Sequence, residues 1–206
     1  MNHRHAATLL SVLAFCFAGP AFAVHPELAA IHEADQAARS EPAAIDWKTL
    51  AVEDRARRER VMQLLRAGEV KAAVDYYHAA MVYQHGQGLE DIRLAHALAT
   101  VAMSLEPDEA RYRWLVAASW DRIMTTQLQP QWYGTQFQST PAGMFLYPVA
   151  DGAVSDQDRR AMQVPTLDES RGRVAEMARM NGLEVDPAPP TIEQLREARR
   201  VPDRAP

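Results

Sequence analysis

Residues 69–84 read Glu69-Val70-Lys71-Ala72-Ala73-Val74-Asp75-Tyr76-Tyr77-His78-Ala79-Ala80-Met81-Val82-Tyr83-Gln84. Counted from Val70, apolar residues recur at i, i+3, i+4, i+7 and i+11, ending at Met81. This spacing places them on one face of an α-helix. Gly86 and Gly88 then interrupt the pattern, because glycine is a poor residue for a helix interior. The stretch therefore predicts an amphipathic helix whose apolar face is buried against other helices.

Three further helical patterns surround this one. Asp46 is a suitable N-cap for a helix over residues 46–66, which Gly68 would end. A second pattern covers residues 89–105, and a third covers 107–127 and starts with proline, a residue favoured in the first helical turn. Because the intervening turns are short, consecutive helices should be antiparallel neighbours. The sequence thus predicts a mainly α fold, a repeat-like bundle of antiparallel helical hairpins. Its predicted core includes Val74, Tyr77, Leu98 and Leu115.

Residues 79–89 resemble part of a Sel1-like or tetratricopeptide repeat. They read Ala79-Ala80-Met81-Val82-Tyr83-Gln84-His85-Gly86-Gln87-Gly88-Leu89. The likeness lies in a helix that ends near a tyrosine and is followed by Gly-x-Gly and an aliphatic residue. It covers two hairpins at most, and repeat arrays generally need three or more units. The resemblance therefore implies tetratricopeptide-like hairpin geometry rather than a true solenoid.

The chain divides into four parts. Residues 1–23 form a predicted signal peptide, and residues 24–46 form an N-terminal arm that we expect to be loosely docked, because it has little apolar periodicity. Residues 47–182 form the helical domain, which contains a small β-like loop or hairpin near 132–149. Residues 183–206 are a Pro-rich linker and a polar C-terminal tail, expected to be exposed or poorly ordered. The predicted strands of the hairpin cover 132–138 and 144–149, on either side of the turn Pro141-Ala142-Gly143.

The first residues have the pattern of a secretory signal. Arg4 gives a positive start, an apolar run follows over residues 6–17, and Ala21-Phe22-Ala23 has the small-x-small form of a cleavage site. The apolar run is shorter than the ~20 residues that span a bilayer, which disfavours a stable membrane anchor. A lipoprotein attached through Cys16 is the alternative, but a lipobox has a small residue where Phe15 stands. We therefore expect cleavage after Ala23 and a periplasmic or secreted protein.

Composition limits the partners and cofactors. Cleavage after Ala23 would remove the only cysteine, so the mature chain would have no disulfide. The net charge of the whole chain is −5, which disfavours nucleic acid as a partner, because phosphate backbones bind basic surfaces. No His-x-x-x-His pair, Gly-x-Ser-x-Gly elbow, phosphate loop or dinucleotide fingerprint is present. We therefore expect no metal and no cofactor.

Three motifs resemble a bacterial family described as domain of unknown function 6624. They are Gln84-His85, Asp121-Arg122 and Pro130-Gln131-Trp132-Tyr133-Gly134-Thr135-Gln136, with Arg159-Arg160 and Leu167-Asp168-Glu169 further along. In that family Ala-Asp usually follows the Gln-His pair, whereas this chain has Gly86-Gln87 and so lacks a carboxylate there. The resemblance covers about residues 76–180. It implies a site at these motifs but no activity, because the family is uncharacterised.

The motifs define a candidate site at two helix ends. The helices over 69–84 and 107–127 are separated by one antiparallel helix, so their C-terminal ends should lie on the same side of the bundle. The candidate binding residues are Gln84, His85, Asp121, Arg122, Tyr133, Gly134, Thr135 and Gln136. We expect the arginine to pair with loop carbonyls or with an anionic ligand through its planar fork.

Three interpretations of this set are open. The polar residues could only fix the shape of the loop, as buried polar networks often do. They could form a binding module for a small polar ligand or a protein. Alternatively, the chain could be a hydrolase that uses His85 and Asp121 beside Thr135. The sequence does not decide whether the protein is an enzyme.

Overall fold

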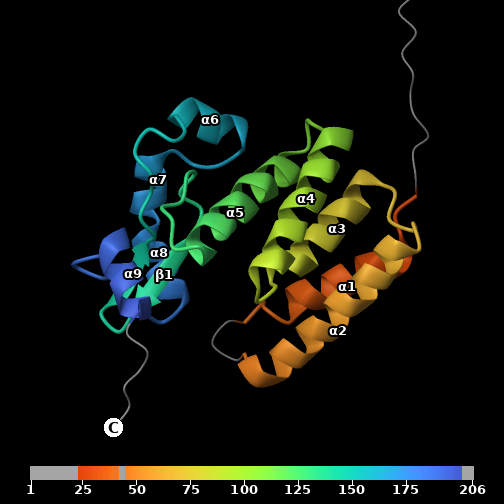
Figure 1. Cartoon of the computed structure of the whole chain (residues 1–206), viewed down its shortest axis with the longest axis horizontal. Coiled ribbons are helices and arrows are strands. Elements are labelled where there is room, and N and C mark those ends of the chain that lie inside the picture. Colours follow the sequence, from red (N-terminus) through yellow and green to blue (C-terminus); the bar gives the residue numbers. More distant parts are fainter. Residues whose placement is uncertain (1–22, 42–44, 201–206) are drawn as a thin grey trace, which may run out of the picture.

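The structure is a computed structural model that describes residues 23–41 and 45–200, so nearly all of the predicted signal peptide lies outside the described residues. Figure 1 shows the arrangement of its elements. The helices are α1 (Pro26–Ala37), α2 (Trp47–Arg66), α3 (Ala73–Gln84), α4 (Leu89–Leu105), α5 (Ala110–Thr126), α6 (Asp156–Ala161), α7 (Leu167–Gly172), α8 (Val174–Met180) and α9 (Ile192–Arg200). The strands are β1 (Phe137–Thr140) and β2 (Gly143–Leu146), paired antiparallel. The predicted fold class, mainly α with a small β hairpin, is confirmed.

The centre of the fold is the series α3, α4 and α5, in which each helix packs against the next and runs the opposite way (Figure 1). Helices α1 and α2 pack on the α3 side of this series. The C-terminal ends of α3 and α5 consequently face the same side of the bundle. None of the described helices is long and apolar enough to cross a membrane.

The core forms where the apolar helix faces meet. Leu115 is 0% exposed and Leu98 is 6% exposed, and Tyr77 packs against the same cluster while remaining partly exposed. Val74 is only partly buried, because it lies in the first turn of α3 at the edge of the core. Alanines of α3 and α4, such as Ala79 and Ala95, are fully buried and let the two helices approach closely.

Helix α1 is part of the core, so the prediction of a loosely docked arm is wrong. Its Leu28 is 0% exposed and belongs to the main hydrophobic cluster, and Ile31 packs against that cluster. The start of the helix is fixed to α3, because the backbone N–H of His25 donates to Asp75 Oδ1 at 2.8 Å. Two apolar residues one turn apart are therefore enough to dock this short helix, despite its weak periodicity.

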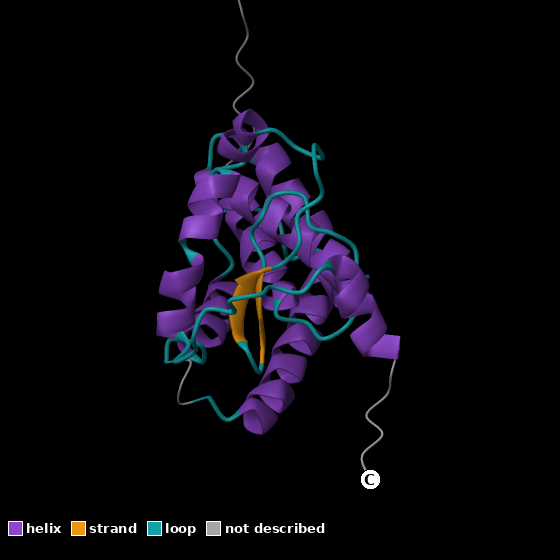
Figure 2. Cartoon of the chain, turned by 90° about the vertical axis from the view of Figure 1, so that its left-hand side faces the viewer, coloured by secondary structure: helices purple, strands orange, loops and turns teal. Residues whose placement is uncertain are grey.

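The hairpin begins later than the sequence predicts. Residues 132–136, predicted to start the first strand, are irregular, and β1 starts only at Phe137. Their backbone N–H groups are directed to side chains rather than to a strand partner, as described below. Figure 2 shows the resulting short hairpin lying among the helices. The second strand ends at Leu146, before the Pro148 that lacks a backbone donor.

The linker and the described part of the tail are not wholly exposed, which corrects the prediction for residues 183–200, while residues 201–206 lie outside the described residues. The backbone N–H of Met144 donates to Glu184 O at 2.8 Å, and that of Asp186 donates to Met144 O at 2.9 Å. This close approach requires glycine at position 143, because a Cβ there would lie 2.6 Å from the backbone nitrogen of Asp186. Helix α9 has no buried residues, but its Arg196 donates to Leu128 O at 2.9 Å.

Candidate functional site

Asp121 is the anchor of the loop after α5. It is 0% exposed, and its Oδ1 accepts hydrogen bonds from the backbone N–H groups of Trp132 at 2.8 Å and Tyr133 at 2.9 Å. Its Oδ2 accepts from the backbone N–H and the hydroxyl of Thr135, at 3.0 and 2.8 Å. Burial raises the pKa of Asp121, although these donors act to lower it. All four bonds hold the loop in place, so the carboxylate has no spare capacity for a ligand.

Two further side chains close the same loop. Gln131 is 0% exposed; its Nε2 donates to Gln136 O at 3.0 Å and to Tyr147 O at 2.7 Å, and its Oε1 accepts from the N–H of Gln136 at 2.8 Å. Arg159, which is 4% exposed, donates from Nε to Tyr133 O at 3.0 Å and from Nη2 to Trp132 O at 2.9 Å. Both residues lie within the family motifs, but neither is among the predicted binding residues.

The loop residues of the predicted site thus form a cluster in which the polar groups hydrogen-bond to one another. We call Asp121, Gln131, Trp132, Tyr133, Gly134, Thr135, Gln136 and Arg159 the loop anchor cluster. Gly134 has a φ of 84°, a conformation that other residues rarely adopt, and this lets the chain turn back toward Asp121. The Nε2 of Gln136 donates to Ala118 O at 3.2 Å, which ties the loop to α5 once more. These contacts agree with the interpretation that this half of the motif set fixes the shape of the loop.

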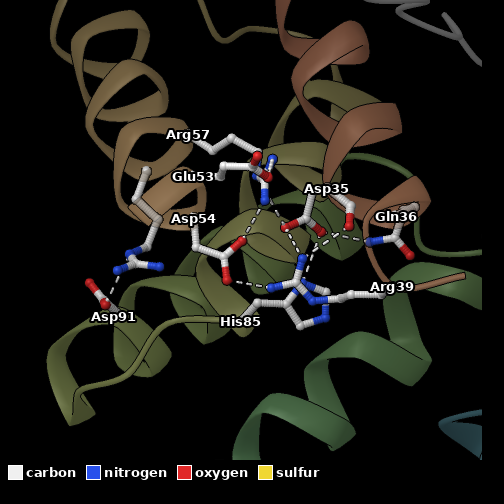
Figure 3. A network of polar contacts seen from close by, with 9 residues as sticks. Asp35, Gln36, Arg39, Glu53, Asp54, Arg57, His85 and Asp91 are labelled. Carbon is white, nitrogen blue, oxygen red and sulfur yellow. Dashed lines mark hydrogen bonds and ion pairs between the residues drawn. The ribbon is translucent and has the colours of Figure 1, made fainter. Parts of the chain in front are cut away.

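His85 lies at the end of α3, and its partner is Asp35 rather than Asp121. His85 Nδ1 is 2.8 Å from Asp35 Oδ2, and Asp35 is 1% exposed (Figure 3). Among the described residues, no hydrogen bond joins His85 to Asp121 or Thr135. Asp121 instead binds Thr135 in the loop, while α1 supplies the carboxylate beside His85.

Asp35 belongs to a charged network between α1, α2 and α3 (Figure 3). Arg39 Nη1 donates to Asp35 Oδ1 at 3.0 Å, and Arg39 Nη2 pairs with Asp54. Arg57 Nη2 donates to Asp54 Oδ1 at 2.8 Å. Burial acts to raise the pKa of Asp54, but the hydrogen bonds from Arg57 and Arg39 outweigh it and lower that pKa. Two arginines thus share two buried aspartates, and Arg57 Nη1 also pairs with the half-exposed Glu53 at 3.5 Å.

A cavity of about 480 Å³ opens beside the network. It lies between α2, the end of α3, the start of α4 and the end of α5, and its volume falls in the range of small-molecule sites. His85 and Arg122, two of the residues predicted to converge on Tyr133–Gln136, both line it, whereas residues 133–136 do not. Its lining residues are Arg39, Trp47, Leu50, Ala51, Asp54, His85, Gly86, Gln87, Ile92, Arg122 and Thr126.

Arg122 is the unusual residue of this cavity. Its guanidinium is partly buried and makes no hydrogen bond or ion pair with any described residue. Burial lowers the pKa of Arg122, and the nearby charge of Arg39 lowers it further. A cation without an acidic partner in such surroundings is energetically unfavourable. The positive charge of Arg122 therefore faces the cavity and would act on a ligand bound there.

The remaining predicted residues have other positions. Gln84 is 8% exposed, its Oε1 is buried without a partner, and it does not line the cavity. Gly86, which stands where the resembled family has alanine, is required by packing, because a Cβ there would lie 2.2 Å from the Cβ of Asp91. Asp91 in turn pairs with Arg58 Nε at 3.2 Å.

Comparisons with known proteins do not assign the site. No family model, no curated protein and no solved structure matches the chain. Within residues 23–41 and 45–200, no group of three or more histidine, cysteine, aspartate or glutamate side chains is placed to hold a metal ion. The function of the site is therefore inferred from the geometry and charge of the cavity itself.

Proposed function

We propose that the protein is an exported binding module for a small anionic ligand, which it holds at the helix ends that carry His85 and Arg122. The observation that carries the proposal is the guanidinium of Arg122, which lines the cavity without an acidic partner. A ligand carboxylate or phosphate would accept two parallel hydrogen bonds from its planar fork. The loop anchor cluster supports α5 and thereby the position of Arg122, rather than contacting the ligand.

The surroundings of Arg122 favour binding over a purely structural role. Asp35 and Asp54 are already shared between Arg39 and Arg57, so neither is free to neutralise Arg122. An anion inside the cavity would restore the balance of charge. It would also lie next to His85, whose Nε2 makes no hydrogen bond to a described residue.

Anion binding is tested by calorimetry with acetate and inorganic phosphate, together with thermal unfolding. The wild-type protein should bind at least one of these anions and unfold at a higher temperature in its presence. The variant Arg122→Gln should lose this response, whereas Arg171→Gln, whose parent side chain is 62% exposed and remote from the cavity lining, should keep it. Absence of binding to the wild type, or equal binding by Arg122→Gln, would contradict the proposal.

The same variant has a second expected effect. Without ligand, Arg122→Gln should be at least as stable as the wild type, since it removes a partly buried charge that has no partner. Binding sites commonly carry such a cost in stability. A clear loss of stability in the unliganded variant would mean that Arg122 has a structural partner.

Hydrolysis is the second candidate function, and the Asp35–His85 pair favours it. A buried carboxylate that holds Nδ1 of an imidazole leaves Nε2 directed elsewhere, as in many general bases. In such a reaction Nε2 would take a proton from water as the water oxygen attacks an ester carbonyl. The alcohol would then leave with that proton. The structure pairs Asp35 with His85, so Asp35 replaces Asp121 in this hypothesis.

The hydrolase hypothesis is tested with mono(4-nitrophenyl) succinate, an activated ester that carries one carboxylate. An enzyme should release 4-nitrophenol faster than the uncatalysed reaction. His85→Gln should abolish this release while acetate still protects the protein against thermal unfolding. Binding of the ester without release by the wild type would leave the binding module as the function.

We also propose that the chain is exported and processed after Ala23. The support is the pattern of residues 1–23 in the sequence. N-terminal sequencing of the protein from the periplasm or medium should begin at Val24. Recovery of a lipid-modified protein attached through Cys16 would contradict this proposal.

The resemblance to family 6624 remains a proposal of the same kind. Its support is that Asp121, Gln131, Thr135 and Arg159, which come from three of the motifs, belong to one hydrogen-bonded cluster. The tetratricopeptide-like interpretation is likewise supported by the packing of α3 against α4 as a helical hairpin.

A further inference from the structure

The cavity wall that α2 contributes changes in character along the helix. Trp47, Leu50, Ala51 and Asp54 stand at i, i+3, i+4 and i+7, which places all four on one face of the helix. The first three are apolar and lie in the first one and a half turns. Only the last, Asp54, belongs to the charged network. The cavity therefore has an apolar end near the start of α2 and a charged end near His85 and Arg122.

Trp47 is the most exposed part of the apolar end. Its side chain borders the cavity, yet the residue is 68% exposed, whereas Leu50 and Ile92 on the same lining are 5% and 2% exposed. A large exposed aromatic residue is common enough by itself on a protein surface. Here it adjoins a cavity that already has buried apolar walls and a cation. An apolar group in the cavity could cover the indole face that the protein leaves open.

The charged end has room for one negative charge. Apart from His85, the charged side chains that line the cavity are Arg39, Arg122 and Asp54, which leaves one positive charge in excess on the lining itself. Asp54 also lines the cavity, and its carboxylate would repel a second negative charge on the ligand. A monoanion therefore matches the site better than a dianion such as a phosphate monoester.

We propose that the ligand of this cavity is a monoanionic organic carboxylate with an aromatic or branched apolar body. This inference rests on the proposed function as an anion-binding module and specifies its ligand class. The carboxylate lies against the guanidinium of Arg122. The apolar body extends along α2 across Leu50 and Ala51 toward Trp47. The cavity volume of about 480 Å³ accommodates a body of one ring or a short branched chain with its carboxylate.

The inference is tested by calorimetry of the full mature chain with four probes. These are acetate, which has the charge alone; benzoate, which has charge and ring; benzyl alcohol, which has the ring alone; and phenyl phosphate, which has a ring and a second charge. Benzoate should bind at least tenfold more tightly than each of the other three. Equal affinities of benzoate and acetate would overturn the apolar half of the inference while anion binding stands. Tighter binding of phenyl phosphate would overturn the monoanion assignment.

Variants separate the two ends of the cavity. Arg122→Gln should reduce benzoate affinity to that of benzyl alcohol. Trp47→Ala should weaken benzoate at least tenfold more than it weakens acetate, and Trp114→Ala serves as the matched control, because that tryptophan is 40% exposed and does not line this cavity. If benzoate, acetate and inorganic phosphate all fail to bind the wild type, the proposed function itself is wrong. If benzoate binds but Trp47→Ala has no effect on it, the placement of the apolar body is wrong.

Discussion

Replacing Asp121 by alanine should release the loop after α5. The change removes the acceptor of four hydrogen bonds, from the amides of Trp132, Tyr133 and Thr135 and from the hydroxyl of Thr135. A hydrogen bond to a charged group contributes about 1.5–3 kcal/mol, so four of them give an upper bound of about 6–12 kcal/mol. The burial cost of the carboxylate, visible in the raised pKa of Asp121, is recovered and reduces this sum. The alanine variant leaves these donors without an acceptor, at about 1–3 kcal/mol for each donor that water does not reach, and we expect a total cost of about 3–5 kcal/mol.

The asparagine variant separates the two oxygens. Asp121→Asn retains an oxygen for the amides of Trp132 and Tyr133, but its NH₂ group faces the N–H of Thr135. One buried donor then meets another donor, and we expect about half the cost of the alanine variant, roughly 2 kcal/mol. Asp151→Ala is the control, because Asp151 is exposed and should change stability by less than about 0.5 kcal/mol.

Two measurements are needed, since the loop can detach while the helices stay folded. Urea unfolding followed by circular dichroism gives the change in global stability. Hydrogen exchange at the amides of Trp132, Tyr133 and Thr135 reports local opening. A cost below about 1 kcal/mol together with unchanged exchange at all three amides would show that Asp121 does not hold the loop.

Three further predictions concern other parts of the fold. Leu98→Ala should reduce the free energy of unfolding by about 2–5 kcal/mol in urea, because Leu98 is 6% exposed in the core; a change below about 0.5 kcal/mol would mean that the core is wrongly described. Gly86→Ala should cost about 1–3 kcal/mol by the same assay, since its Cβ would overlap Asp91, whereas Gly88→Ala, with no atom within 4 Å of its Cβ, should be tolerated. Burial lowers the pKa of His78 from 6.5 to about 4. As the pH falls, this imidazole is therefore protonated in the unfolded chain before it is protonated in the folded protein. The contribution of neutral His78 to the free energy of unfolding is therefore fully present above about pH 6.5 and is lost as the pH drops toward 4. In unfolding experiments between these pH values, the stability of His78→Gln should fall less steeply than that of the wild type.

The helical part of the fold could be predicted because its signals are local. The apolar spacing from Val70 to Met81 and the glycines that follow it are properties of a single helix, and they remain valid after packing. The shared direction of α3 and α5 followed from counting helices, and His85 and Arg122 do line one cavity, although the loop on which they were predicted to converge does not line it. The helix starts were less accurate, because the carboxylate of Asp75 accepts the N–H of Ala72 at 3.2 Å and begins α3 later than the apolar pattern does.

The missed residues depend on contacts between distant segments. Asp35 lies 50 positions before His85, on a helix with weak apolar periodicity, so no local pattern indicated that it would hold the imidazole. Residues 132–136 contain β-compatible side chains, but the amides of Trp132, Tyr133 and Thr135 donate to Asp121 instead of to a neighbouring strand. The β propensity of single residues does not indicate such competition. Arg159 lies 26 positions after Tyr133, whose carbonyl oxygen it binds, and only the family motif pointed to it.

The contact between β2 and residues 184–186 affects how the chain can be shortened. One edge of β2 pairs with β1, and Met144 uses the other edge to bind Glu184 and Asp186. A chain that ended at Gly182 would expose that edge beside Met144 and Phe145, which are 7% and 1% exposed in the intact protein. Uncovered strand edges next to apolar side chains pair readily with other chains. The segment 184–186 therefore covers this edge against aggregation, and during synthesis the edge stays open until that segment has left the ribosome.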